Sequence, residues 1–251
     1  MKKALLFIGL ILSAAIVNGQ DKSTDKMSAA STPVSKNLIK VNLLSLPLNN
    51  YSFGYERVIA RKITLGIGYR FMPEGGIPLK SLVTDLIDDA ETSRQIDQFR
   101  MSNTAITPEI RFYMGKQALR GFYLAPFARF SNYKASGPIE FDVNGTTETI
   151  PLSGKLNTVT GGLLIGAQWK LGGRVYLDWW MLGPQYGSAK GNFDGKKSLT
   201  TEEQAELREE LEDLEIPFAD TETTVDANGA RMDITGPWAG VRAGLSLGIR
   251  F

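Results

Sequence analysis

The C-terminal segment alternates between two kinds of side chain. From Ala239 to Phe251 every odd position is apolar, whereas every even position is Gly, Ser or Arg. Period-two alternation is typical of a β-strand with two unlike faces, and this segment is longer than the usual ~5–6 residues of a soluble strand. A strand that crosses a membrane in a closed barrel takes about 9–11 residues, with lipid on one face and a polar lumen on the other.

The same alternation recurs upstream. Together with weaker cases it predicts strands at 36–46, 51–59, 62–72, 104–114, 121–133, 157–171, 174–187 and 233–251. Three connections are short (60–61, 115–120 and 172–173), and three are long (73–103, 134–156 and 188–232), with one further short connection at 47–50. An even strand count, with short turns on one side and long loops on the other, is typical of outer-membrane barrels. The pattern predicts an all-β fold: an eight-stranded antiparallel transmembrane β-barrel with long, partly helical extracellular loops.

Aromatic residues cluster near both ends of the predicted strands. The set near the loop ends is Tyr69, Phe71, Phe130, Tyr186 and Trp238, and the set near the turn ends is Phe112, Phe122, Trp169 and Phe251. Two such belts are what anchoring at the two membrane interfaces predicts. The alternative is that these rings fill a soluble core.

The N-terminus has the three-part design of a secretory signal peptide. Lys2 and Lys3 precede an apolar run, Ala4 to Val17, and small residues follow at the expected cleavage position. The apolar run is short for a membrane-spanning helix, the alternative interpretation. We therefore expect a signal peptide at 1–19, a flexible periplasmic segment at 20–35 and a barrel at 36–251, exported to the outer membrane of a Gram-negative bacterium.

Composition excludes much ordinary chemistry. The 251 residues include no histidine and no cysteine, so Ser-His and Cys-His dyads, His-ligated zinc and thiolate ligands are absent. A net charge of +1 gives no electrostatic case for nucleic acid. Barrel-resident enzymes such as the omptin proteases depend on histidine. We expect a protein that is not an enzyme and has no cofactor and no metal site.

Charged residues on the predicted inner faces could form a lumen network. Its members are Glu56, Arg70, Glu109, Arg111, Arg129, Lys170, Asp178, Arg242 and Arg250. They could line a polar channel or a proton-handling site. Alternatively they neutralise one another inside a lumen that, with eight strands, is just wide enough to be filled by side chains. Trp180, Leu182 and Tyr123 are further lumen candidates.

The last long loop is acidic and partly helical. Residues 188–230 carry twelve acidic and four basic side chains. Thr200 and Glu203 form a capping-box pattern that predicts a helix to about residue 215, with Leu207, Leu211 and Leu214 on one face. A second amphipathic stretch spans 79–87. The leucines could bind a partner protein, or they could pack on each other and the barrel rim. Asn-Gly pairs at 144–145 and 228–229 predict hairpin turns beyond the membrane.

Two parts of the chain resemble known groups. Residues 244–251, in which Leu245, Leu247, Ile249 and Phe251 alternate, look like the C-terminal signal that outer-membrane barrels present to their assembly machinery. The segments 40–44, 53–57 and 64–69 resemble a family of small outer-membrane barrels of unknown function. The resemblance implies an OmpX/OmpA-like eight-stranded barrel and brings no assigned activity.

These observations favour a structural or interaction role. We expect a non-enzymatic barrel whose external loops contact another envelope component, with outer-membrane lipid, lipopolysaccharide, the assembly machinery and an envelope protein as partners. The alternative is a narrow channel or carrier for a small or amphiphilic solute.

Overall fold

A computed structural model describes residues 35–76, 98–212 and 218–251. The predicted signal peptide, almost all of the predicted N-terminal segment, the predicted helix at 79–87 and Leu214 lie outside the described residues. Among the described helices, none is long and apolar enough to cross a membrane.

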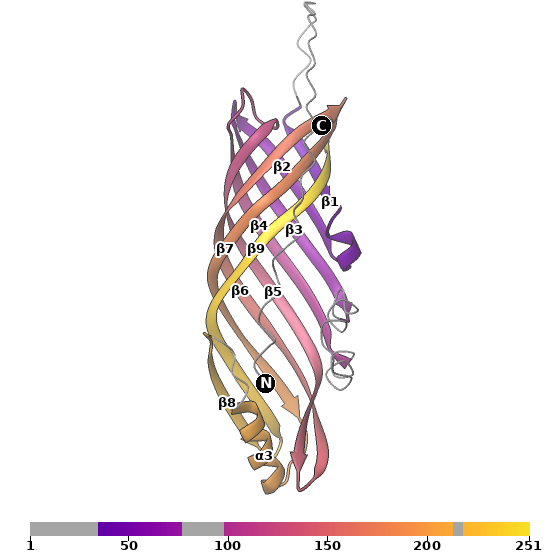
Figure 1. Cartoon of the computed structure of the whole chain (residues 1–251), viewed down its shortest axis with the longest axis vertical. Coiled ribbons are helices and arrows are strands. Elements are labelled where there is room, and N and C mark those ends of the chain that lie inside the picture. The colour runs from indigo at the N-terminus through magenta and orange to yellow at the C-terminus, as the bar shows by residue number, and fades with distance from the viewer. Residues whose placement is uncertain (1–34, 77–97, 213–217) are drawn as a thin grey trace, which may run out of the picture. The chain divides into compact units, whose positions relative to one another are not determined.

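The described chain is a single antiparallel sheet closed into a ring (Figure 1). The ring strands are β1 (Asn37–Asn42), β2 (Tyr51–Ala60), β3 (Ile63–Gly75), β4 (Arg100–Tyr113), β5 (Gly121–Val143), β6 (Thr146–Gly172), β7 (Val175–Lys196) and β9 (Gly229–Arg250). Each pairs with its neighbour, and β1 pairs with β9 from Leu38–Arg250 to Asn42–Ser246, which completes the ring. The predicted eight-stranded antiparallel ring is confirmed.

The ring has two unlike ends. The short connections β2–β3, β4–β5 and β6–β7 lie at one end, which we call the turn end, near the C-terminus (Figure 1). The opposite end, the loop end, carries α3 (Thr201–Glu212) and β8 (Asp220–Asp226), which pairs with β9 beyond the ring. β1 ends at Asn42, earlier than the predicted residue 46, and the 3-10 turn η1 (Leu46–Leu48) follows it.

The strands β5, β6 and β7 extend well beyond the predicted ends. The long connection 134–156 is a hairpin, with pairing that runs up to Val143 and Thr146. Asn144 and Gly145 form its turn with φ angles of 52° and 80°, the left-handed conformation that a two-residue hairpin turn requires. The prediction for Asn144–Gly145 is therefore confirmed, whereas the β8–β9 turn is formed by Ala227 and Asn228, with Gly229 already paired to Asp226.

The extended strands, α3 and β8 form a protrusion with its own apolar core. Its core side chains are Phe141, Ile150, Leu152, Leu199, Leu207, Leu211, Val225, Ala230 and Met232. Helix α3 begins where the capping box predicted, because Thr200 N–H donates to Glu203 Oε2 at 2.7 Å and Glu203 N–H donates to Thr200 Oγ1 at 3.3 Å. Burial of its leucine face against the sheet then holds a short helix that would be marginal alone.

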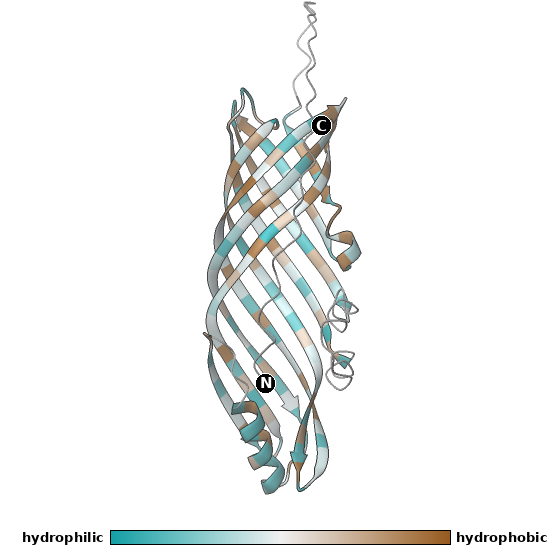
Figure 2. Cartoon of the chain, viewed as in Figure 1, coloured by the Kyte–Doolittle hydropathy of each residue, from teal (hydrophilic) through white to brown (hydrophobic). Residues whose placement is uncertain are grey.

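Along the ring, outward side chains are mostly apolar, and many inward ones are polar or charged. On β9, Val241 and Ile249 are 65% and 55% exposed, whereas Arg242 and Ser246 are 7% and 1% exposed. Figure 2 shows apolar positions scattered along the strands, while α3 is mostly hydrophilic. The predicted face alternation of β9 is confirmed.

Two predicted positions are wrong. Leu182 points outward and is 51% exposed, because the β7–β9 register shifts between Trp180 and Gly183. Trp238, expected in the outer aromatic belt, is half-buried and lies 5.4 Å from Tyr133 between ring centroids. Both rings line a cavity inside the ring.

Candidate functional site: a buried charge network

The centre of the ring interior is a network of ion pairs. Lys40 Nζ lies 2.7 Å from Glu56 Oε2 and 2.7 Å from Asp178 Oδ2. Arg111 Nη1 lies 2.8 Å from Asp178 Oδ2 and 3.4 Å from Glu56 Oε2. These four side chains are at most 3% exposed, so each charge depends on its partners rather than on water.

A third acidic residue, Glu109, links this centre to the loop side of the interior. Arg111 Nη2 lies 2.5 Å from Glu109 Oε1, and Arg242 Nη1 lies 3.4 Å from Glu109 Oε2. The guanidinium of Arg242 also stacks over Phe127 and Trp180, at 4.4 and 4.9 Å from the ring centroids. The connected network thus holds three carboxylates and three cations, which makes it neutral as a unit.

Uncharged donors satisfy the remaining carboxylate oxygens. Tyr113 and Thr64 donate their hydroxyls to Glu56 Oε1, both at 2.6 Å. Tyr123 donates its hydroxyl to Asp178 Oδ1 at 2.7 Å, and Trp180 Nε1–H donates to Asp178 Oδ2 at 3.0 Å. These hydrogen bonds hold the Glu56 and Asp178 carboxylates in one arrangement.

An apolar layer closes the interior at the turn end. Leu119, in the β4–β5 turn, is fully buried with a φ angle of 66° and packs with Leu38 and Tyr176. The turn is held by Ala118 N–H, which donates to the Arg61 carbonyl at 2.7 Å. The charge network is therefore covered on one side by side chains.

The predicted lumen residues fall into three groups. Glu56, Glu109, Arg111, Asp178 and Arg242 form the network, as the self-neutralising alternative predicted. Arg70 and Arg129 lie farther toward the loop end and contact Asn50 and Ser131 through Nε, at 2.9 and 3.2 Å.

The third group lies at the turn end and is not part of the network. Lys170 is exposed to solvent there. Arg250 donates to the Ser35 carbonyl at 2.6 Å and to Tyr176 Oη at 3.0 Å. Membership of these two residues in the lumen network was a wrong prediction, since alternation identifies a face but not a depth along the strand.

Sequence reasoning missed Lys40, the cation that joins two of the three carboxylates. The alternation of side chains could have identified Lys40 as an inward residue, because Leu38, Lys40 and Asn42 share the inward face of β1. Its stem runs past inward glycines: a Cβ added at Gly248 would lie 2.8 Å from Lys40 Cγ. The glycines of the ring thus make room for large inward side chains.

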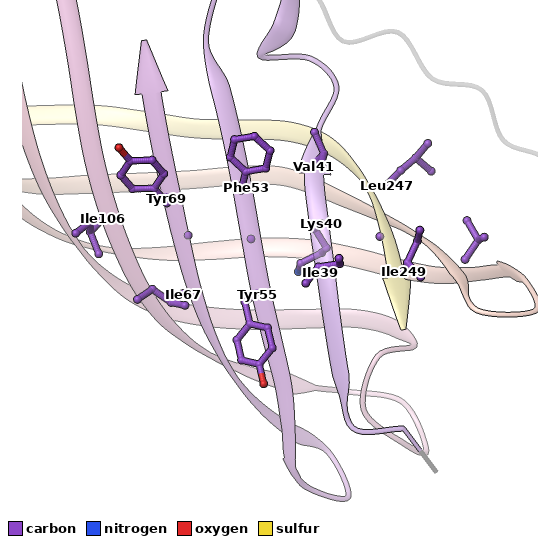
Figure 3. Close-up of a pocket in the computed structure, with 14 residues that line it drawn as sticks. Ile39, Lys40, Val41, Phe53, Tyr55, Ile67, Tyr69, Ile106, Leu247 and Ile249 are labelled. Carbon is purple, nitrogen blue, oxygen red and sulfur yellow. The ribbon is translucent and has the colours of Figure 1, made fainter. Parts of the chain in front are cut away.

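The outer wall carries a shallow apolar groove of about 840 Å³ over β1, β2, β3 and β9 (Figure 3). Ile39, Phe53, Ile67 and Leu247 line it and are 38–50% exposed. Gly54, Gly68 and Gly248 complete the lining, at positions whose side chains would point inward. The groove is part of an outer wall whose exposed large apolar side chains occur on strand after strand, which is unusual for a soluble monomer.

Two of the three predicted partner-binding leucines, Leu207 and Leu211, lie in the protrusion. Leu207 and Leu211 are 0% and 1% exposed and pack inside its core, so these two side chains are not available to a partner. This corrects the expectation of a leucine docking face and agrees with its alternative, internal packing. The outer face of α3 is instead acidic, with Glu206, Glu209 and Glu210 exposed.

The structure defines the chain as an all-β protein in which eight antiparallel strands close on themselves around a charged interior. A model of the family described as "Protein of unknown function (DUF3575)" matches residues 22–193. This match spans more than half of the chain, which therefore belongs to that family.

The structure of CarO from Acinetobacter baumannii is a distant match. It is 12% identical, the alignment covers 87% of this chain and 98% of that chain, and the TM-score is 0.40. No curated protein matches the chain.

Proposed function

We propose that this chain is a non-enzymatic outer-membrane β-barrel, OmpX/OmpA-like in strand number, whose protrusion contacts another envelope component. The observation that carries the proposal is the contrast between the two faces of the ring. Outward positions are apolar on strand after strand, for example Leu65 on β3, Ile106 on β4 and Leu163 on β6, at 44–48% exposure. Inward positions hold ion pairs. Lipid outside and polar groups inside is the arrangement of a barrel in a bilayer.

The aromatic residues support the same orientation. Tyr69, Phe130 and Tyr186 lie outward toward the loop end, and Phe112, Phe122 and Trp169 lie outward toward the turn end, all 40–67% exposed. Rings at two levels are expected at the two lipid–water interfaces. In this proposal the turn end faces the periplasm and the protrusion lies outside, against lipopolysaccharide.

The C-terminal strand supports recognition by the barrel assembly machinery. Leu247, Ile249 and Phe251 are 38–55% exposed on the outward face of β9 and its end, and Leu245 shares that face. β9 follows the other ring strands in the sequence, and its pairing with β1 closes the ring. We propose these four residues as the assembly signal.

The interior argues against the alternative of a channel. Lys40, Glu56, Arg111 and Asp178 fill the middle of the ring, and the Leu119 layer covers them at the turn end. Ions would have to displace side chains whose charges are already paired. We expect no conductance in a planar bilayer for the purified protein.

The absence of native cysteine allows a sharp test of membrane residence. Leu163→Cys on the outer wall and Glu206→Cys on α3 are labelled with bimane and placed in vesicles whose acyl chains carry bromine. We expect quenching for the wall position only, because only that position would lie among the acyl chains. Equal quenching at both positions would contradict the membrane orientation.

The interaction role is tested separately on the acidic face of α3. Glu206, Glu209 and Glu210 are changed together to Gln, and the tagged protein is purified from native outer membranes in mild detergent. We expect loss of a companion that the wild type retains, because the exposed carboxylates would face a basic partner. A matched control changes Lys62, Lys116 and Arg120 to Gln at the turn end. A wild type that purifies alone contradicts the interaction role.

A further inference from the structure

The interior toward the loop end holds more cations than its acids can pair. The carboxylates of Glu56, Glu109 and Asp178 are already shared among Lys40, Arg111 and Arg242. Among the residues that the structure describes, Arg70 and Arg129 have no carboxylate within ion-pair distance. Two formal positive charges are therefore left over inside the ring.

These two arginines and Arg242 line one cavity. It has a volume of about 290 Å³ and is lined by Arg70, Arg129 and Arg242, with Asn50, Gln185 and Trp180 among the other side chains. One water takes up about 30 Å³ in the liquid, so the cavity has room for a small polyatomic group. Arg129 and Arg242 are 6% and 7% exposed, so both guanidiniums are withdrawn from bulk water.

Within the described part of the chain, Arg70 and Arg129 each make a side-chain hydrogen bond through Nε alone. Arg129 uses Nε to contact Ser131 at 3.2 Å, and Arg70 uses Nε to contact Asn50 at 2.9 Å. Arg242 Nε is buried and, within the described part of the chain, makes no hydrogen bond. Buried donors without acceptors are costly, and like charges held together raise that cost. An anion in the cavity would relieve both.

The cavity also reaches the outer wall. β9 pairs with β8 up to Thr235 and with β1 from Ser246 onward. In the described part of the chain, no strand pairs with residues 236–244 on that side. The cavity lies here, between β9 and the loop after β1, and Leu44 and Val241 among its lining residues are 58% and 65% exposed. An apolar rim beside a cationic cavity fits an amphiphile with an anionic head.

We propose that Arg70, Arg129 and Arg242 form a binding site for a phosphate group inside the ring. A phosphate monoester carries a charge of about −1.5 to −2 at pH 7 and has three strong acceptor oxygens. That charge matches the two unpaired cations, and guanidinium forks pair with phosphate oxygens in a fixed geometry. A single carboxylate would leave one arginine unpaired. Tyr133 and Trp238, whose rings are 5.4 Å apart, bound the site on its loop side.

The phosphate could come from free phosphate or from a lipid headgroup that enters through the wall. The site itself does not depend on membrane residence; only the lipid source rests on the proposed function. Binding is therefore measured on the full chain in an uncharged detergent, where failure of the membrane proposal cannot affect it. The probes are inorganic phosphate and monododecyl phosphate, titrated by calorimetry at constant ionic strength.

We expect the wild type to bind one or both probes. The double variant Arg70→Gln, Arg129→Gln should bind at least tenfold more weakly, yet melt without ligand at the same temperature as the wild type or higher, because repulsion is removed. Arg120→Gln, an exposed control at the turn end, should bind normally. If only monododecyl phosphate binds, the site serves a lipid headgroup; similar affinities indicate that the phosphate group alone suffices.

Two results would overturn the proposal. One is a wild type that binds neither probe, and the other is equal binding by the wild type and the double variant. If the double variant fails to fold, Arg70→Lys with Arg129→Lys keeps the charge and removes the forked geometry. That variant should still bind more weakly than the wild type, and unchanged affinity contradicts the site.

Discussion

Replacing Asp178 by Asn would remove one charge from the middle of the ring with almost no change in size. The Asp178 carboxylate accepts hydrogen bonds from Lys40 at 2.7 Å, Arg111 at 2.8 Å and Tyr123 at 2.7 Å, and it is fully buried. The network is neutral with three acids and three cations. The variant would therefore leave one positive charge uncompensated in the interior.

The expected cost follows from this loss of balance. Breaking a buried ion pair from one side costs about 3–5 kcal/mol, whereas replacing both partners by uncharged groups is often close to neutral. Lys40→Met breaks the same pair from the cationic side, with a loss in the same range. The double variant keeps Glu56 and Glu109 with Arg111 and Arg242 and is neutral again. Its loss should fall below the sum of the single losses by about 2 kcal/mol or more.

The assay is guanidinium-induced unfolding of the refolded protein in detergent micelles, followed by tryptophan fluorescence. Trp180 reports on the site directly because its Nε1–H donates to Asp178 Oδ2 at 3.0 Å. Free energies are taken from midpoint and slope for each corner of the mutant cycle. The control cycle uses Arg231→Gln and Asp233→Asn, an exposed pair at 2.7 Å in the protrusion, for which we expect no measurable change.

Strictly additive losses in the Lys40–Asp178 cycle would refute the reasoning. They would mean that these two charges do not compensate each other inside the ring. A double variant less stable than both single variants together would indicate that packing, not charge balance, dominates the site.

The remaining predictions concern the outer wall, the protrusion core and the cap of α3. If the wall faces lipid, Leu247→Arg should lower the free energy of unfolding in vesicles by roughly 2–4 kcal/mol near mid-bilayer; Glu206→Arg is the exposed control, and equal tolerance contradicts the prediction. Leu207→Ala opens a cavity in the protrusion core and should lower the local stability of the protrusion by about 2–5 kcal/mol. Hydrogen exchange should then become faster in β8 and stay unchanged in β2, which is the control for a local effect. The Thr200 backbone N–H and hydroxyl lower the pKa of Glu203, so its contribution to α3 is complete above the ordinary carboxyl pKa and disappears as pH falls through the lowered pKa. Exchange rates in the first turn of α3 should show this acid dependence in the wild type and lose it in Glu203→Gln.

The alternation of side chains along the chain determined the strands and their faces. Unlike environments on the two sides of one strand require a period of two in the side chains, so β9 and the inward position of Asp178 could be predicted without any partner strand. Local turn chemistry was equally readable: Asn144–Gly145 and the Thr200 cap are formed by residues close in sequence.

Tertiary structure decided which inward residues meet. Lys40 contacts Asp178 because β1 closes the ring onto β9, which pairs with β7, and that meeting depends on register summed around the ring. One register shift was enough to turn Leu182 outward. The alternation also did not give the position of each inward residue along the axis of the ring. Arg70, Arg111 and Lys170 share the inward pattern but lie at different heights between the loop end and the turn end. Only the closed ring shows that the Arg111 level is neutral while the level of Arg70 and Arg129 is not, because charges balance through distances in space and not through spacing along the chain.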